Sequence, residues 1–285
     1  MGNSEEIQKT ADATGISIQD FELVDVTDEE WLMQLIEEYC AKQPLNSQKT
    51  MKRKSANFLY IALMMQEVGR VDTVVGGYTL PSSDFHRAVL ETIGMKEGWD
   101  TISSFCLTEY EGFQGSEGHM LAFGDCVVCE NPNAEQLANM AIGACEAMNK
   151  LLGWDPKCGL LSYSTCGSTE GELVAKVIDA VKIANEKRPD LAIDGEFQFD
   201  AAVNPKVAEK KVKRESRVAG KANIVLFPTV EVGNIGVKML QAFCGMDSYL
   251  IMMGFAKPVM DCSRSSPVSE TVGNIAIACI MAQEG

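Results

Sequence analysis

The sequence predicts an α/β protein with mostly parallel sheets whose two faces are covered by helices. Strand-like and helix-like segments alternate along most of the 285 residues. Most of the strand-like segments are continuous apolar runs, which is typical of strands that are buried on both faces. A chain of this length can bury a real core and forms one or two domains.

The first quarter of the chain is expected to be mainly helical. A helix should begin at Ser4, because two acidic residues follow it. Residues 21–26, FELVDV, are strand-like. Residues 28–42 carry apolar side chains at helical spacing, and residues 51–69 predict one further helix. Residues 71–77, VDTVVGG, end in two glycines and are expected to form a short buried strand.

The alternation continues to the end of the chain. After the strand at 71–77, Ser82, Ser83 or Asp84 can cap a helix. The remaining expected strands cover residues 101–107, 119–128, 158–164, 191–194, 222–228 and 249–255. The remaining expected helices cover residues 133–153, 170–188, 232–244 and 269–283.

Composition narrows the function classes. The formal net charge is −15, which argues against sequence-independent nucleic-acid binding, because that binding depends on Lys and Arg neutralising phosphates. A small anionic ligand remains compatible, since a cleft can be locally positive on an acidic protein. The ten cysteines are scattered and no signal peptide is visible, so we expect a reduced, cytoplasmic protein. No apolar run approaches 18 residues, so no membrane span is expected.

Residues 254–270, GFAKPVMDCSRSSPVSE, place many polar groups between two apolar elements. The stretch follows an expected strand, and ligands of open α/β sheets bind beyond the carboxyl ends of the strands. Ser263 and Arg264 would lie there, and Arg264 can neutralise a phosphate or an oxyanion. Glu270 can act as a base, or it can simply compensate the dipole of the last helix. The pattern alone leaves both roles of Glu270 open.

Two other loops also follow expected strands. Arg87 lies in the first turn of the helix after residues 71–77, where a phosphate would meet free N–H groups. The simpler reading is an exposed arginine on a capped helix. Ser164, Thr165, Gly167 and Ser168 form a compact, donor-rich loop before a helix. A phosphate cradle is plausible there, but the loop lacks the lysine and the spacing of a P-loop.

Three weaker patterns favour structural roles. Asp194, Glu196 and Asp200 are close enough in sequence to suggest a divalent-metal site, although a capped loop is commoner and no histidine is near. Cys126 and Cys129 form a lone CxxC, for which core packing is the better interpretation. The basic residues between 206 and 221 are expected to form a solvated surface rather than a phosphate contact.

Longer segments carry a resemblance. They are FGDCVVCENPNAEQLANMAI (123–142), LLSYSTCGS (160–168), PDLAIDGEFQFDAAV (189–203), VAGKANIVLFPTVEVGNIGVKMLQ (218–241) and GFAKPVMDCSR (254–264). Together they resemble the phosphate acetyltransferase/phosphate butyryltransferase family. The matches run in family order from about residue 70 to the end of the chain.

The resemblance implies two doubly wound α/β domains with mostly parallel sheets, an isocitrate/isopropylmalate dehydrogenase-like architecture with a cleft between the domains. The first domain would comprise residues 1–99 plus 250–285, and the inserted second domain residues 100–249. MGNSEEI at the start is similar to a family segment that follows a first βαβ unit. The sheet of the first domain is therefore expected to be smaller than that of the family.

The resemblance also implies an activity. The family transfers a short acyl group, acetyl or possibly propionyl or butyryl, between coenzyme A and orthophosphate. Coenzyme A, acyl phosphate and phosphate would be the partners. No metal and no permanently bound cofactor is expected, and the chain would form a homodimer. Ser263, Arg264 and Arg87 match family catalytic residues, and Glu270 stands where the family has an aspartate base. The implied substrate-binding residues are Ser164, Thr165, Gly167, Ser168, Lys257 and Asn234.

Two family arginines are absent. One position carries Ala242, and the other falls around Ala41 and Lys42. Lysine does not reproduce the planar fork of arginine, and losing one charge-assisted contact costs about 1.5–3 kcal/mol. These departures raise an alternative: a non-catalytic or regulatory paralogue that binds acyl-CoA or phosphate.

Overall fold

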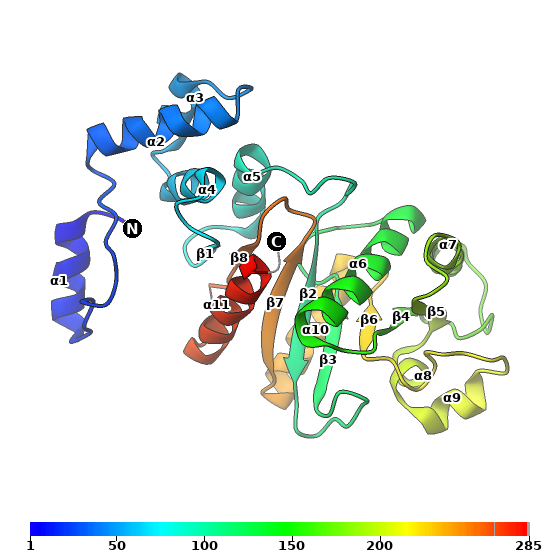
Figure 1. The fold of residues 1–285 in the computed structure, drawn as a ribbon. Coiled ribbons are helices and arrows are strands. Elements are labelled where there is room, and N and C mark those ends of the chain that lie inside the picture. The colour runs from blue at the N-terminus through cyan, green and yellow to red at the C-terminus, as the bar shows by residue number, and fades with distance from the viewer. Residues whose placement is uncertain (265, 284–285) are drawn as a thin grey trace.

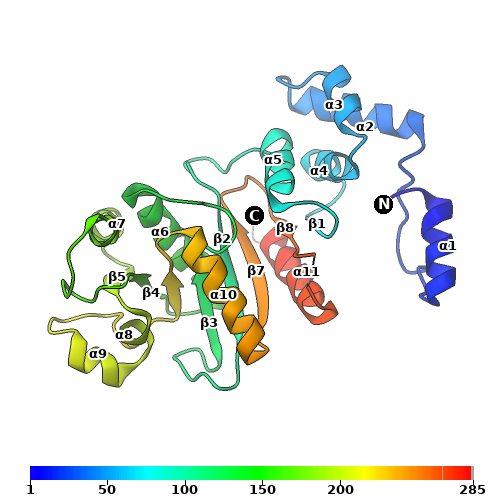
Figure 2. The ribbon, with the colours of Figure 1, turned by 180° about the vertical axis from the view of Figure 1, so that it is seen from behind.

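The computed structural model describes residues 1–264 and 266–283 and has an α/β fold in which parallel strand pairs predominate. Figures 1 and 2 show a large sheet with helices on both faces, and a smaller helical part at the N-terminal side. The helices are α1 (Ser4–Thr14), α2 (Glu29–Lys42), α3 (Gln48–Lys54), α4 (Phe58–Val68), α5 (Ser82–Thr92), α6 (Ala134–Leu152), α7 (Glu172–Lys187), α8 (Phe199–Val203), α9 (Pro205–Lys211), α10 (Val230–Cys244) and α11 (Val268–Gln283). The strands are β1 (Val74–Gly76), β2 (Ser103–Glu109), β3 (Met120–Gly124), β4 (Lys157–Leu161), β5 (Ala192–Phe197), β6 (Ile224–Leu226), β7 (Asp247–Met253) and β8 (Val259–Asp261).

The large sheet has the strand order β5-β4-β6-β3-β2-β7. The pairs β5–β4, β4–β6 and β6–β3 are parallel, whereas β2 runs antiparallel to both β3 and β7. Alternate residues of each strand face opposite sides, as the pleat requires. Phe105 and Ile224 face α6 and α7, while Cys106 and Val225 face α8 and α10. Both faces of the sheet are therefore buried, which explains the continuous apolar runs in the sequence.

The N-terminal part contains a two-stranded parallel sheet, β1–β8. Helices α4 and α5 pack on this sheet through an apolar cluster that includes Leu63, Phe85 and Val89, and α2 packs on α4. Helix α1 projects from this part (Figure 1), and Gly2 ties the segment back through backbone hydrogen bonds with Val24 and Val26.

Helix α11 connects the two sheets. It lies along β7, the edge strand of the large sheet, and also contacts β8 and β1 (Figure 1). A side chain of α11 hydrogen-bonds to the backbone of this edge strand: Asn274 Oδ1 accepts from Leu250 N at 2.9 Å. Edge strands need such cover, because their unpaired N–H groups would otherwise attract other strands.

Most of the predicted elements are confirmed within a few residues, but two predictions are wrong. Residues 21–26 form no strand beyond a single bridge between Gly2 and Asp25, because no strand lies alongside them. Residues 51–69 are not one helix. The structure breaks that segment into α3 and α4, because the Asn57 side chain accepts from Leu59 N and starts a new helix. The sequence reading also did not identify α8, α9 and β8 as separate elements.

The expected division into residues 1–99 plus 250–285 and residues 100–249 stays a prediction. No helix in the described part of the chain is long and apolar enough to cross a membrane.

Candidate functional site

The loops that follow β1 and β8 leave the small sheet at the same edge. The two strands are parallel, and Gly76 pairs with Asp261. Cys262 N donates to Gly76 O at 2.8 Å just beyond the paired residues. Gly77 has φ +96°, and a Cβ there would lie 2.2 Å from Asp261 Oδ1, so only glycine allows this approach. The stretch that carries Ser263 and Arg264 therefore lies at the carboxyl ends of these strands.

A buried His–Asp pair lies where α5 meets this edge. His86 Nε2 lies 3.2 Å from Asp261 Oδ2, and the side chains are only 9% and 3% exposed. The aromatic rings of Phe85 and Phe255 flank the imidazole, with centroids 6.1 and 6.2 Å away. Since Arg87 is the next residue of α5, this pair brings the segment bearing Arg87 beside the segment bearing Arg264.

The two arginines that were predicted to act together are both exposed. Arg87 forms an ion pair with Asp84 one turn earlier in α5. Arg264 makes no hydrogen bond or ion pair with any of residues 1–264 and 266–283, which are the ones the structure describes. Among these residues, no contact between the Arg87 and Arg264 guanidinium groups occurs. The His86–Asp261 pair joins the segments that carry them, but the convergence of the two arginines on one anion stays a prediction.

Ser263 and Glu270, in contrast, line one hollow of about 280 Å³. The other lining residues come from α10, from the turn after it, from the start of β7 and from the loop before α11: Lys238, Gln241, Gly245, Met246, Asp247 and Pro267. Helix α10 thus forms the wall opposite the loop that carries Ser263.

The Glu270 carboxylate is buried and held by three hydrogen bonds. Its Oε1 accepts from Ser248 N and from Ser248 Oγ, each at 3.2 Å, and from Gln241 Nε2 at 3.4 Å. Gln241 Nε2 also donates to Ser248 Oγ at 2.5 Å. All of these bonds reach one oxygen, and no hydrogen bond to Oε2 occurs among the described residues. The carboxylate is therefore fixed in position with one oxygen left for a proton.

The same contacts show that Glu270 has a structural role. Ser248 is in β7, so Glu270 satisfies a backbone N–H of the edge strand, as Asn274 does one turn later. Both interpretations of Glu270, base and structural residue, are thus compatible with the geometry, and a substitution that keeps the acceptor can separate them.

The Cys262 thiol, next to Ser263, is a poor nucleophile. Burial raises the pKa of the Cys262 thiol above its ordinary value. Asn274 Nδ2 lies 3.6 Å from its sulfur. Since the thiolate is the reactive form, Cys262 stays inert near neutral pH.

The donor-rich loop at residues 164–169 is closed around a carboxylate. Ser164 Oγ donates to Glu196 Oε1 at 2.9 Å, and Gly167 N donates to the same oxygen at 2.8 Å. Thr165 N donates to Ser168 Oγ at 3.1 Å, and Thr165 Oγ1 accepts from Gln198 N at 2.9 Å. The loop already satisfies much of its hydrogen bonding internally. Substrate binding by Ser164, Thr165, Gly167 and Ser168 stays a prediction.

The two other predicted substrate-binding residues make contacts within the fold. Lys257 Nζ donates to Gln66 O at 2.8 Å and to Glu67 O at 3.0 Å, and lies 3.3 Å from the Glu67 carboxylate. It thereby caps the C-terminal end of α4, where a cation is favoured. Asn234 Nδ2 donates to Cys126 O at 3.0 Å. Their contact with substrate also stays a prediction.

The two positions where family members have arginine, here Ala242 and Lys42, lie on α10 and α2. Ala242 is exposed near the end of α10. Lys42 reaches the end of α4, where its Nζ donates to Glu67 O at 2.5 Å. Lys42 and Lys257 therefore share the same helix end, and neither lines the hollow beside Glu270.

The acidic and basic clusters of the sequence largely pair with each other. Arg214 forms a two-pronged ion pair with Asp194, both contacts at 2.7 Å, and Lys211 pairs with Asp200. No group of three or more metal-ligating side chains occurs within residues 1–264 and 266–283. The acids are thus engaged in ion pairs and hydrogen bonds of the fold.

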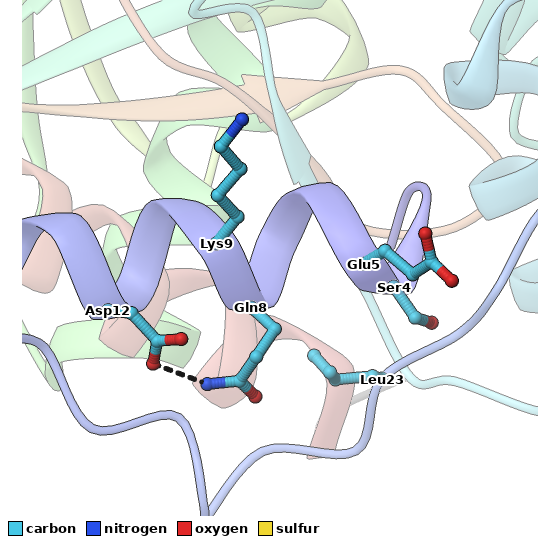
Figure 3. Close-up of a pocket in the computed structure, with 6 residues that line it drawn as sticks. All are labelled: Ser4, Glu5, Gln8, Lys9, Asp12 and Leu23. Atoms are coloured by element: carbon cyan, nitrogen blue, oxygen red, sulfur yellow. Dashed lines mark hydrogen bonds between the residues drawn. The ribbon is translucent and has the colours of Figure 1, made fainter.

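A further hollow lies on α1, away from the strands. Gln8 Nε2 donates to Asp12 Oδ1 at 2.8 Å. Figure 3 shows this bond, with Lys9 pointing away from the two side chains. Glu5, Gln8, Lys9 and Asp12 are all exposed, and Ser4 and Leu23 complete the lining. An open surface of this kind does not position reacting groups, so the hollow beside Glu270 is the better candidate site.

Sequence reasoning missed Lys238, Gln241 and Asp247 in that hollow. Lys238 and Gln241 are three residues apart in α10, so they share a helix face. The sequence shows that spacing, but it does not show that this face of α10 lies opposite the loop that carries Ser263.

Comparisons with known proteins agree with this architecture. The family model described as "Phosphate acetyl/butaryl transferase" matches residues 1–279. The chain is 41% identical over 228 residues to a phosphate acetyltransferase of Clostridium acetobutylicum, covering 80% of this chain and 68% of the relative. It is 34% identical over 279 residues to a phosphate acetyltransferase of Bacillus subtilis, covering 97% and 84%.

A solved structure is similar as well. The crystal structure of a phosphotransacetylase from Streptococcus pyogenes superimposes with a TM-score of 0.88 at 31% identity, covering 100% of this chain and 85% of that one. With a family match over nearly the whole length, the chain belongs to the phosphate acetyl/butaryl transferase family.

Proposed function

We propose that this protein is a phosphate acyltransferase that reversibly transfers a short acyl group between coenzyme A and orthophosphate. The observation that carries the proposal is the hollow that Ser263 and Glu270 line together, at the carboxyl end of β8. In such a space a hydroxyl can donate a hydrogen bond to an oxyanion, and a fixed carboxylate can accept a thiol proton. Family membership supports the reaction class.

In the proposed reaction, the thiol of coenzyme A attacks the carbonyl carbon of an acyl phosphate. Glu270 accepts the thiol proton as the C–S bond forms. The Ser263 hydroxyl donates a hydrogen bond to the oxyanion of the tetrahedral intermediate. The C–O bond to phosphate then breaks, and the leaving oxygen takes up the proton held by Glu270, which gives the thioester and orthophosphate and restores the carboxylate.

Arg264 and Arg87 supply positive charge in this scheme. Arg264 follows Ser263 directly and has no ion-pair partner among the described residues, so its guanidinium is available for a phosphoryl group. Arg87 would have to exchange its ion pair with Asp84 for the substrate. Such an exchange is inexpensive, since exposed ion pairs contribute at most about 1 kcal/mol. No bound cofactor is needed, because coenzyme A is itself a substrate.

We further propose that the protein is a homodimer that buries one face of α10 and α11. Exposed apolar side chains recur at helical spacing on α10, with Phe243 83% exposed, and on α11, with Val268 79% and Val272 61% exposed. The two helices are neighbours, since Gln241 contacts Glu270. A large exposed apolar patch on a protein marks an interface. Light scattering should give twice the chain mass of 31.0 kDa, and Phe243→Glu should reduce it to the monomer value.

Turnover is tested with the purified protein, coenzyme A and acetyl, propionyl or butyryl phosphate, following thioester formation. The reverse direction is followed by phosphate-dependent thiol release from the acyl-CoA. We expect turnover in both directions with at least one short acyl group. If well-folded protein turned over none of the three acyl phosphates, the proposal would be refuted.

A further inference from the structure

The hollow beside Glu270 has an unusual balance of charge for a site that receives anions. Its ionisable lining residues are Asp247, Glu270 and Lys238. Acyl phosphate, orthophosphate and coenzyme A are all negatively charged, and the chain itself carries a net charge of −15. Two carboxylates repel a phosphoryl group, and neither Arg264 nor Arg87 lines the hollow, so a cation among its own lining residues would offset that repulsion.

Lys238 is the lining residue that carries this charge. It lies on α10, is exposed, and its Nζ donates one hydrogen bond to Gln241 Oε1 at 3.2 Å. Among the described residues it has no ion pair. An ammonium group has three N–H donors, so two remain for a ligand.

The lysine is also joined to the proposed base. Gln241, which accepts from Lys238, donates to Ser248 Oγ and to Glu270 Oε1. A continuous chain of hydrogen bonds therefore runs from the ammonium group to the carboxylate. One turn beyond Lys238, position 242 carries alanine, which can offer no charge to the same face of α10.

We propose that Lys238 binds the phosphoryl oxygens of acyl phosphate and orthophosphate in this hollow. The inference rests on the proposed acyl transfer and adds to it a substrate-contacting cation on α10. Lysine acts as a point charge rather than as a fork. Its replacement should therefore weaken phosphate binding more than it alters the thiol chemistry.

The test compares Lys238→Met, Lys238→Arg and Lys210→Met. Lys210 lies on α9, is exposed and does not line the hollow, so its variant removes the same charge elsewhere. We expect Lys238→Met to raise KM for orthophosphate at least tenfold. Lys238→Arg should stay within about threefold of the unchanged protein, and Lys210→Met within twofold. An unchanged KM in Lys238→Met, or an equal rise in Lys210→Met, would overturn the inference.

Binding of orthophosphate is measured in parallel by calorimetry, because binding does not require turnover. If the unchanged protein binds phosphate and Lys238→Met does not, the inference stands even where no acyl transfer is seen. If acyl transfer proceeds and phosphate binds equally well to both, the inference fails while the proposed function survives.

Discussion

The hollow beside Glu270 and the loop at residues 164–169 are both rich in polar groups, and both follow strands of parallel pairs. They differ in what their hydrogen-bonding groups already contact. In the loop, Ser164 and Gly167 donate to the buried Glu196 carboxylate. In the hollow, Lys238 donates one hydrogen bond and keeps two N–H donors for a ligand. The two regions therefore differ in how far their donors are engaged within the fold, and substrate binding by the loop stays a prediction.

The largest change in stability is expected where Glu196 is removed. Glu196→Ala should lower the free energy of unfolding by about 2–4 kcal/mol, because it leaves the buried Ser164 hydroxyl and the Gly167 N–H without their acceptor. Urea unfolding measures this, with Glu196→Gln as the matched control, since it keeps one acceptor oxygen. A loss below about 0.5 kcal/mol in Glu196→Ala would show that the loop does not depend on the carboxylate.

A pair of serine variants compares the two regions directly. Ser263→Ala should lower kcat about 100-fold, the usual effect of removing one oxyanion donor. Ser168→Ala should change kcat and the KM for coenzyme A by less than about threefold, because Ser168 Oγ already accepts from Thr165 N. A tenfold rise in KM for coenzyme A in Ser168→Ala would instead establish that the loop binds substrate.

Much of the fold could be predicted, because the residues that start and stop a helix or strand lie within that element's own segment of sequence. Helix α6 shows this, since Asn133 and Gln136 form a capping box before an apolar face. The strand-like appearance of residues 21–26 was misleading, because a strand exists only when another strand pairs with it. The reversed direction of β2 was equally invisible, and it is β2 that places β7 at the sheet edge, where α11 covers it.

The site was only partly predictable for the same reason. Ser263 and Glu270 are seven residues apart, so a single loop and helix start can bring them together. Lys238 and Gln241 come from α10, and their place opposite that loop depends on how α10 and α11 pack. Local sequence carries no signal for a contact of that kind, and helical spacing shows only that the two side chains share a face.

The central claim is that Glu270 removes the thiol proton in addition to supporting the edge strand. Glu270→Gln tests it most directly, because glutamine retains an oxygen that can accept from Ser248 but is not a base. An unfolding curve first confirms that the variant is folded. Its kcat for acyl transfer from acetyl phosphate to coenzyme A should then be about 10²–10⁴-fold lower than that of the unchanged protein. A folded Glu270→Gln variant with kcat within threefold of the unchanged protein would contradict the account.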